Sequence, residues 1–207
     1  MKNRKREPKS KLKEQVEPLL TALEGNGPLL QRDYWAVIKN CRLNCREVAL
    51  FVKEHFPTLP PESLVVFRKK DGKTGPLQVD DEMEVEIRMA GKTAVRVIHE
   101  DGNSITLCTM QKHPEAGRIT FGAYRNEKND VVFHIRSRAR SSSIKNLVGF
   151  LTTGDAMQTN TWTDFIDRLS HMVGDGVVGA IHVETSKIEE EDAESVTVTP
   201  TFIARGT

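Results

Sequence analysis

The stretch that decides the fold is Glu82–Met89, with the sequence E-M-E-V-E-I-R-M. Apolar and polar side chains alternate along it. Successive side chains of a β-strand point to opposite faces of a sheet, so this strand has one apolar face and one charged face. Stretches with similar alternation follow near 92–99, 104–111, 118–126 and 131–139. The sequence therefore predicts an antiparallel sheet with one face toward a core and one toward solvent.

The apolar face needs a cover, and the sequence after the strands supplies one. Every connection between the predicted strands has the length of a hairpin, which is typical of a meander. After it, 144–151 predicts a short helix. A longer helical stripe ends at Gly174. This stripe consists of Trp162, Phe165, Ile166, Leu169, Met172 and Val173.

The first part of the chain predicts a strand, a helix and a second strand, at 34–38, 44–56 and 64–67. Asn44 and Glu47 have the spacing of a capping box at the start of that helix. Leucine spacing over 9–24 predicts an N-terminal amphipathic helix, in spite of Pro18. Weak strand patterns occur at 180–185 and 195–203.

Charge and composition limit the class of protein. The 30 basic and 29 acidic residues argue against a chain built mainly to bind nucleic acid. Seven basic residues lie in 1–13 and six acidic residues in 184–194. Such runs are typical of solvated tails, and the alternatives are a phosphate-binding arm, a nuclear-import signal or contact between the two tails.

The sequence has neither the apolar core of a signal peptide nor an apolar run of about 18 residues, so we expect a cytoplasmic protein with no membrane span. The three cysteines, Cys41, Cys45 and Cys108, do not have the spacing of a metal site, and core packing is the favoured role. We expect no metal and no cofactor.

The order of the predicted elements resembles the helix-grip fold of the START-related superfamily, also called Bet v 1-like, polyketide-cyclase-like or SRPBCC. In that α+β fold a bent antiparallel sheet wraps around a long C-terminal helix, and a cavity lies between them. The resemblance covers about 33–173. It implies a helix-grip domain at 33–176, between a basic extension at 1–32 and an acidic one at 177–207.

A shorter stretch, 106–121, is similar to a narrower family of unknown function that carries the motif H-P-E-x-G. The motif stands here as His113-Pro114-Glu115-Ala116-Gly117. Arg118 follows it, where an acidic residue is usual in that family. A tight turn explains the motif, and an acid–base pair of His113 and Glu115 at a cavity rim is the alternative.

A few polar residues share the apolar register of the predicted sheet. The most suggestive is His99, and the others are Thr93, Thr109 and Ser137. Each needs a hydrogen bond or contact with a ligand or water, or else lies at a strand end. The predicted ligand-binding residues are His99, Thr109, Ser137, Phe121, Phe133, Trp162 and Phe165, with His113 and Glu115 at the rim.

The opposite register carries charge, including Arg136, Arg138 and Arg140 together with His134. Cross-strand charge pairing on a wet face explains these residues, and a phosphate-binding stripe is the alternative.

The sequence therefore predicts a domain that binds a hydrophobic or amphipathic small molecule, lipid-like or polyaromatic, between sheet and helix. A cyclase or dehydratase using the same cavity is one alternative, and a protein-interaction module without a ligand is another. The fold alone does not choose among them, and the sequence leaves the oligomeric state open.

Overall fold

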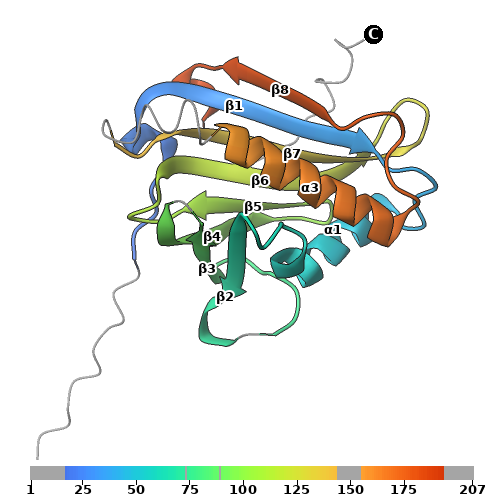
Figure 1. The fold of residues 1–207 in the computed structure, drawn as a ribbon, viewed down its shortest axis with the longest axis horizontal. Helices are drawn as coiled ribbons and strands as arrows, with labels where there is room; N and C mark the ends of the chain where they lie inside the picture. The colour runs from blue at the N-terminus through green and yellow to red at the C-terminus, as the bar shows by residue number, and fades with distance from the viewer. Residues whose placement is uncertain (1–16, 73, 89, 144–154, 194–207) are drawn as a thin grey trace, which may run out of the picture.

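The computed structural model describes residues 17–72, 74–88, 90–143 and 155–193. These residues form an eight-stranded antiparallel sheet in the order β2-β3-β4-β5-β6-β7-β1-β8, with two α-helices (Figure 1). The strands are β1 (Asn26–Val37), β2 (Val65–Lys69), β3 (Glu82–Ile87), β4 (Gly91–Glu100), β5 (Ser104–Thr109), β6 (Glu115–Arg125), β7 (Val131–Ser141) and β8 (His182–Lys187), and the helices are α1 (Cys45–His55) and α3 (Asp155–Val173).

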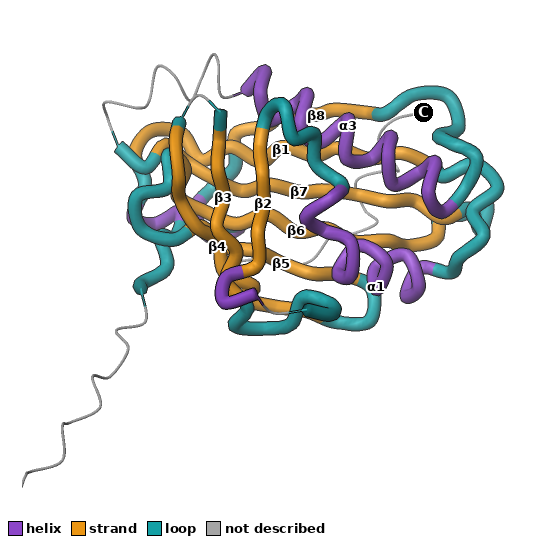
Figure 2. Tube along the Cα trace, turned by 60° about the horizontal axis from the view of Figure 1, so that its bottom comes forward, coloured by secondary structure: helices purple, strands orange, loops and turns teal. Residues whose placement is uncertain are grey.

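Both helices lie on the same side of the sheet, as Figure 2 shows from a second direction. We call this side the inner face and the opposite side the outer face. β2 to β7 follow one another through the sheet in chain order, and β1 then pairs with β7. The meander, the bent sheet and the long C-terminal helix are the α+β architecture that the sequence predicts.

The alternation in β3 is confirmed by burial. Met83 and Val85 are 0% and 2% exposed and belong to the core, whereas Glu84 is exposed. Val85 lies opposite Phe67 of β2 and Thr93 of β4, so these side chains share the inner face. The predicted Met89 position lies outside the described residues.

The predicted capping box of α1 is also confirmed. Asn44 Oδ1 accepts hydrogen bonds from the backbone N–H groups of Arg46 and Glu47 at 3.0 and 3.1 Å. Glu47 Oε2 accepts one from the backbone N–H of Asn44 at 2.7 Å. The cap satisfies backbone donors that an α-helix leaves unpaired in its first turn.

The stripe of α3 packs against the sheet with one exception. Trp162, Phe165, Ile166, Leu169 and Val173 are buried, but Met172 is 51% exposed. The short helix predicted at 144–151 lies outside the described residues. None of the described helices is both long enough and apolar enough to cross a membrane.

The N-terminal helix predicted over 9–24 is wrong for the described part. Leu19 forms a β-bridge with Met110, and Leu20 N–H donates to the backbone oxygen of Thr109 at 2.7 Å. Only a short 3-10 turn, Ala22–Glu24, follows. Leu20 is buried, and so the leucines serve packing against β5 rather than a helical face. β1 then begins at Asn26, inside the stretch assigned to the extension.

The C-terminal extension adds to the sheet. The strand predicted at 180–185 is present as β8, which pairs with β1. A 3-10 turn, Glu190–Asp192, follows, and Arg140 Nη2 donates to Glu190 Oε1 at 2.8 Å. Ala193 is 1% exposed in a small cluster with Ala22 and Leu29. The acidic run is therefore partly packed rather than a fully solvated tail; the strand predicted at 195–203 lies outside the described residues.

The cysteines are not joined by a disulfide. Cys41 and Cys45 are half-buried against the core, and Cys108 is buried. The core-packing role favoured from the sequence is confirmed for Cys41 and Cys45, whereas Cys108 is buried outside that core cluster.

Candidate functional site

Two side chains meet at the end of the inner face where α3 begins. Gln158, in the first half of α3, donates hydrogen bonds through Nε2 to both carboxylate oxygens of Glu115, the first residue of β6. A carboxylate only accepts hydrogen bonds, so it fixes the orientation of the amide: Nε2 faces Glu115 and Oε1 is directed elsewhere. The contact joins residues 43 positions apart in the chain.

Trp162 lies one helical turn after Gln158, on the same side of α3. Its side chain is largely buried, with 8% of the residue exposed. In the described part of the chain, neither Trp162 Nε1 nor Gln158 Oε1 has a hydrogen-bond partner, and both atoms are buried. Each such atom costs about 1–3 kcal/mol of stability. One buried donor and one buried acceptor therefore lie on the same stretch of helix.

The sheet carries small residues at this end. β7 contributes Ser137 and Ala139, which are 3% exposed each, and Gly117 of β6 lies opposite Ala139. Arg32 of β1 lies opposite Ser137 and is fully buried. The first half of α3 thus faces small residues and the buried Arg32, and an aromatic ring, that of Phe121, meets it at Trp162.

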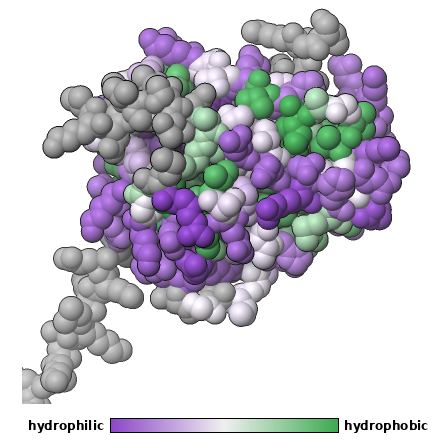
Figure 3. Space-filling view, viewed as in Figure 1, coloured by the Kyte–Doolittle hydropathy of each residue, from purple (hydrophilic) through white to green (hydrophobic). Residues whose placement is uncertain are grey.

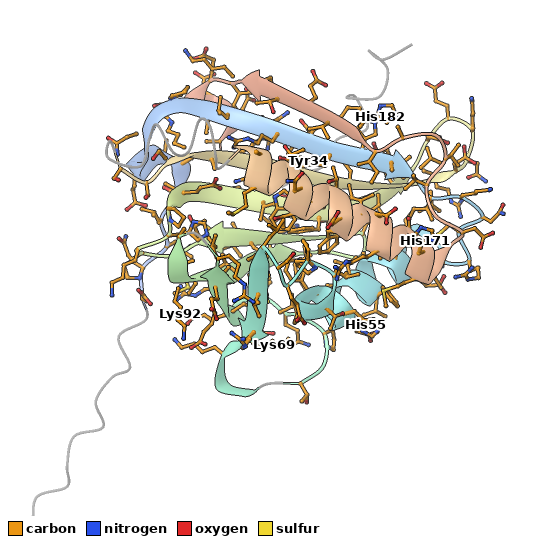
Figure 4. All side chains as sticks on the ribbon, in the orientation of Figure 1. Tyr34, His55, Lys69, Lys92, His171 and His182 are labelled. Atoms are coloured by element: carbon orange, nitrogen blue, oxygen red, sulfur yellow. The ribbon has the colours of Figure 1, made fainter. Side chains whose placement is uncertain are left out.

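The second half of α3 faces a dense aromatic cluster. Phe165 is fully buried, with its ring centroid 5.3 Å from that of Phe121 and 6.0 Å from that of Phe133. Phe56, beyond α1, closes the cluster with a centroid 4.9 Å from that of Phe121. Tyr34 of β1, which is 0% exposed, belongs to the same core and is labelled beside the first half of α3 in Figure 4. The spacing is that of packed rings, so this half is a filled core.

The predicted ligand-binding residues are thus divided between these two regions. Ser137 and Trp162 lie at the small-residue end, with Glu115 beside them. Phe133 and Phe165 lie in the packed cluster, and Phe121 contacts Trp162 at the boundary, with centroids 5.4 Å apart.

Thr109 lies on the inner face as predicted, but its hydroxyl is already used. Oγ1 donates to the backbone oxygen of Leu20 at 2.7 Å and accepts from the N–H of Gly117 at 3.0 Å. We therefore leave Thr109 out of the candidate ligand site.

The predicted position of His99 is wrong. The pairing of β4 with β5 shifts between Val97 and His99, and His99 lies opposite Thr106, on the outer face. Its side chain is 39% exposed, with Nε2 3.6 Å from Asp101 Oδ2. The cause is a β-bulge, which inserts one extra residue and reverses the alternation beyond it.

His113 serves the turn before β6. The Glu115 N–H donates to His113 Nδ1 at 3.0 Å. Burial lowers the pKa of His113 to about 4, and the alternative bond, in which a protonated Nδ1 donates to the backbone oxygen of Glu115 at 3.0 Å, offsets only part of that effect. The turn interpretation agrees with this geometry. A neutral imidazole tied to backbone is poorly suited to exchange protons with a ligand.

This pKa predicts a loss of stability in mild acid. The unfolded His113 protonates near pH 6.5 and the folded one near pH 4, so stability is complete above pH 6.5 and declines as pH falls toward 4. The expected loss from this residue is about 3 kcal/mol. Urea unfolding at pH 7.5 and 4.5 measures it. His113→Asn retains an acceptor for the Glu115 N–H, and it should have a smaller pH dependence than wild type; an unchanged one would contradict the assignment.

The outer face holds a buried polar network that the sequence analysis placed in solvent. Asp33 Oδ1 accepts from His134 Nε2 and from Arg136 Nε, each at 2.6 Å. Gln31 Nε2 donates to Asp33 Oδ2 at 2.8 Å, and Arg138 Nε donates to Gln31 Oε1 at 2.8 Å. None of the five residues is more than 7% exposed. The wet face expected here, and with it a solvent-facing phosphate stripe, is therefore wrong.

The protonation states in this network follow from its geometry. Burial raises the pKa of Asp33, but the hydrogen bonds and charges of His134 and Arg136 outweigh that effect and leave the pKa below its ordinary value. Burial lowers the pKa of His134, and Asp33 offsets only part of this. His134 is thus neutral and donates Nε2–H to the carboxylate, which is a structural role.

A surface pocket of about 260 Å³ lies over β2 to β4, and Glu84 and Ala94 are among the residues that line it. Several of its lining charges are already paired, for example Arg68 with Glu86 at 3.4 Å and Lys70 with Glu82, outside the pocket, at 2.7 Å. It is consistent with the cross-strand charge pairing predicted for this part of the outer face. Within the described ranges, no group of three or more histidine, cysteine or acidic side chains is placed to bind a metal ion.

Sequence reasoning gave no role at the site to Gln158 and overlooked Arg32. Gln158 precedes Trp162 by four residues on a helix, a spacing that a search for polar positions beside the apolar stripe would find. Arg32 was assigned to the extension, because no pattern marked the start of β1.

Comparison with known proteins supports the fold and no more. No family model matches the chain, and no curated protein matches it in sequence. Its fold is similar to that of a hypothetical protein from Helicobacter pylori, with 9% identity and a TM-score of 0.51 over 84% of this chain and 98% of that one. It is also similar to truncated norcoclaurine synthase from Thalictrum flavum, with 10% identity and a TM-score of 0.51 over 72% and 98%.

At these identities the similarity is one of architecture. An antiparallel sheet against a C-terminal helix is consistent with the helix-grip fold of norcoclaurine synthase. The likeness of 113–117 to the narrower H-P-E-x-G family stays a prediction.

Proposed function

We propose that this protein binds a mainly apolar small molecule bearing a hydroxyl group, between the inner face of the sheet and the first half of α3. The observation that carries the proposal is the pair of buried polar atoms without partners in the described chain, Trp162 Nε1 and Gln158 Oε1. A hydroxyl accepts one hydrogen bond and donates another. It would satisfy both atoms at once.

The surroundings favour an apolar body for the ligand. Phe121 and Trp162 offer ring surface on one side, Ser137 and Ala139 are small side chains on the other, and Arg32, opposite Ser137, adds a buried charge there. Burying about 300 Å² of apolar ligand surface contributes roughly 7 kcal/mol before the cost of association. Micromolar affinity is therefore the expected range.

A pair of matched probes tests this proposal. 2-Naphthol and 2-methylnaphthalene have the same rings, and a hydroxyl in one replaces a methyl group in the other. We expect 2-naphthol to bind at micromolar concentration in a fluorescence titration, and 2-methylnaphthalene at least tenfold more weakly, because only the hydroxyl satisfies both buried atoms.

Trp162→Phe supplies the decisive variant, since it keeps an aromatic ring and removes the N–H. It should reduce the difference between the probes to less than threefold, and Trp35→Phe on the outer face should leave the difference intact. If neither probe binds wild-type protein, the proposal fails. If both bind equally well, binding between sheet and helix stands and the role of the hydroxyl is contradicted.

The enzyme alternative would require a proton-transfer group at the same place, and Glu115 is the carboxylate beside the two unpartnered atoms. A cyclase or dehydratase would lose turnover in Glu115→Gln while still binding 2-naphthol. Hydrogen bonding of Glu115 to Gln158 and the low pKa of His113 favour binding without chemistry.

A further inference from the structure

β8 ends the described sheet and pairs with β1 along one edge only. The backbone N–H of Ile188 donates to Leu29 O at 3.1 Å, in register with that pairing. Backbone groups of an antiparallel strand alternate between its two edges. Residues 182, 184 and 186 therefore direct their N–H and C=O groups toward β1, and residues 183, 185 and 187 direct theirs away from it. Among the described residues, no strand meets this second edge.

Two apolar side chains at this edge are exposed to solvent, which is unfavourable for valine. Val183 is 44% exposed and Val178, just before the strand, is 53% exposed. Apolar residues gather at the upper right of Figure 3, over the region where Figure 1 draws β8 beside the end of β1. An uncovered strand edge with apolar side chains is a template for pairing with another chain.

The sequence of β8 is complementary to itself in one antiparallel register. If Val183 lies opposite Val183 of a second copy, His182 lies opposite Glu184 of that copy, and the reverse pair forms by symmetry. Opposed residues point to the same face, and His182 and Glu184 do share a face because they are two positions apart. The two Val183 residues would exchange backbone hydrogen bonds, since their groups point to the open edge.

Neighbouring registers are less favourable. A shift of one residue in each copy places Glu184 opposite Glu184, and like charges directly opposed are destabilising. A shift of two residues places Val183 opposite Lys187 and leaves Glu184 opposite Ser186. His182 is also held in position, because its ring stacks on Trp35 of β1 at 5.2 Å between centroids and 14° between planes (Figure 4 places it at the start of β8).

We propose that two copies of this chain associate through their β8 edges, about a two-fold axis beside Val183, and continue the sheet from one copy into the other. The interface is isologous, with the same residues on both sides. Backbone hydrogen bonds supply the attraction, the paired valines bury apolar surface, and the two His182–Glu184 pairs set the register. Strand pairing of this length is a small interface, so the dimer exchanges with monomer at micromolar concentration.

Sedimentation velocity over a dilution series tests the association. We expect wild-type protein at about 200 µM to sediment mainly as a dimer and to dissociate on dilution. Thr185→Pro removes an N–H that points away from β1, so it should raise the dissociation constant at least tenfold and leave thermal unfolding of the monomer almost unchanged. Wild-type protein that stays monomeric throughout the series overturns the proposal.

A charge exchange tests the register. His182→Glu sets two carboxylates opposite each other and should weaken the dimer at least tenfold. The double variant His182→Glu with Glu184→His restores opposed partners and should recover most of the lost affinity. A double variant as weak as the single one, or a Thr185→Pro variant that dimerises like wild type, would show that another surface joins the copies.

Discussion

Asp33→Asn is expected to destabilise the protein by about 3–5 kcal/mol, although it changes only one oxygen to a nitrogen. Asp33 is 1% exposed and accepts from His134, Arg136 and Gln31. Removing its charge leaves the Arg136 guanidinium buried without its carboxylate, and breaking a buried pair on one side costs this much. The free energy of unfolding in urea at pH 7.5 measures the loss.

The chain offers a matched control in a second pair of aspartate and histidine. Asp167 Oδ1 lies 3.7 Å from His171 Nε2 on the surface of α3, where the side chains are 56% and 64% exposed. Asp167→Asn should change stability by less than about 0.5 kcal/mol, because solvent screens exposed pairs. Equal effects of the two substitutions would show that the outer-face network is solvated, as the sequence alone suggested.

The contrast between these two pairs also explains what sequence could predict. The alternation in β6 and β7 assigns side chains to faces correctly, because strand geometry is local. Whether a face is wet depends on segments far away in the chain, such as Glu190, which contacts Arg140 from beyond α3. A charged stripe therefore looks solvated in the sequence even where the fold buries it.

Two local predictions failed for related reasons. His99 lies beyond a β-bulge, and nothing in its immediate sequence marks the inserted residue, so counting in steps of two gives the wrong face. Leu19 and Leu20 belong to a stretch with helical leucine spacing but pair with the chain at the end of β5 instead, because backbone groups at Thr109 and Gly117 are available there. Tertiary pairing overrode a helical pattern that Pro18 already weakened.

The candidate site was predictable in part. The apolar stripe of α3 and the inner-face register of the strands predicted that Trp162, Phe121 and Ser137 lie near one another. The contact of Gln158 with Glu115 was not predictable, since it joins a strand to a helix across a hairpin and an intervening segment. Contacts of this kind depend on how the helix is placed along the sheet, which residue patterns do not specify.

Phe165→Ala is expected to cost about 3–5 kcal/mol, the usual range for removing a buried phenylalanine ring. Phe165 is fully buried against rings from four other residues, on α3, the sheet and the chain beyond α1. Truncation leaves a cavity that these large, mutually packed rings fill only in part. Urea unfolding followed by far-UV circular dichroism measures the loss.

Met172→Ala on the same helix is the control, because Met172 is 51% exposed and its removal should cost less than about 0.5 kcal/mol. A loss of stability below about 1 kcal/mol for Phe165→Ala would mean that the second half of α3 is loosely packed against the sheet. A ligand would then have room there as well. The expected large loss of stability would instead confine ligand binding to the first half of α3. A tightly packed aromatic cluster leaves no space for a ligand. The stability of one half of the helix thus bears directly on where the other half can bind.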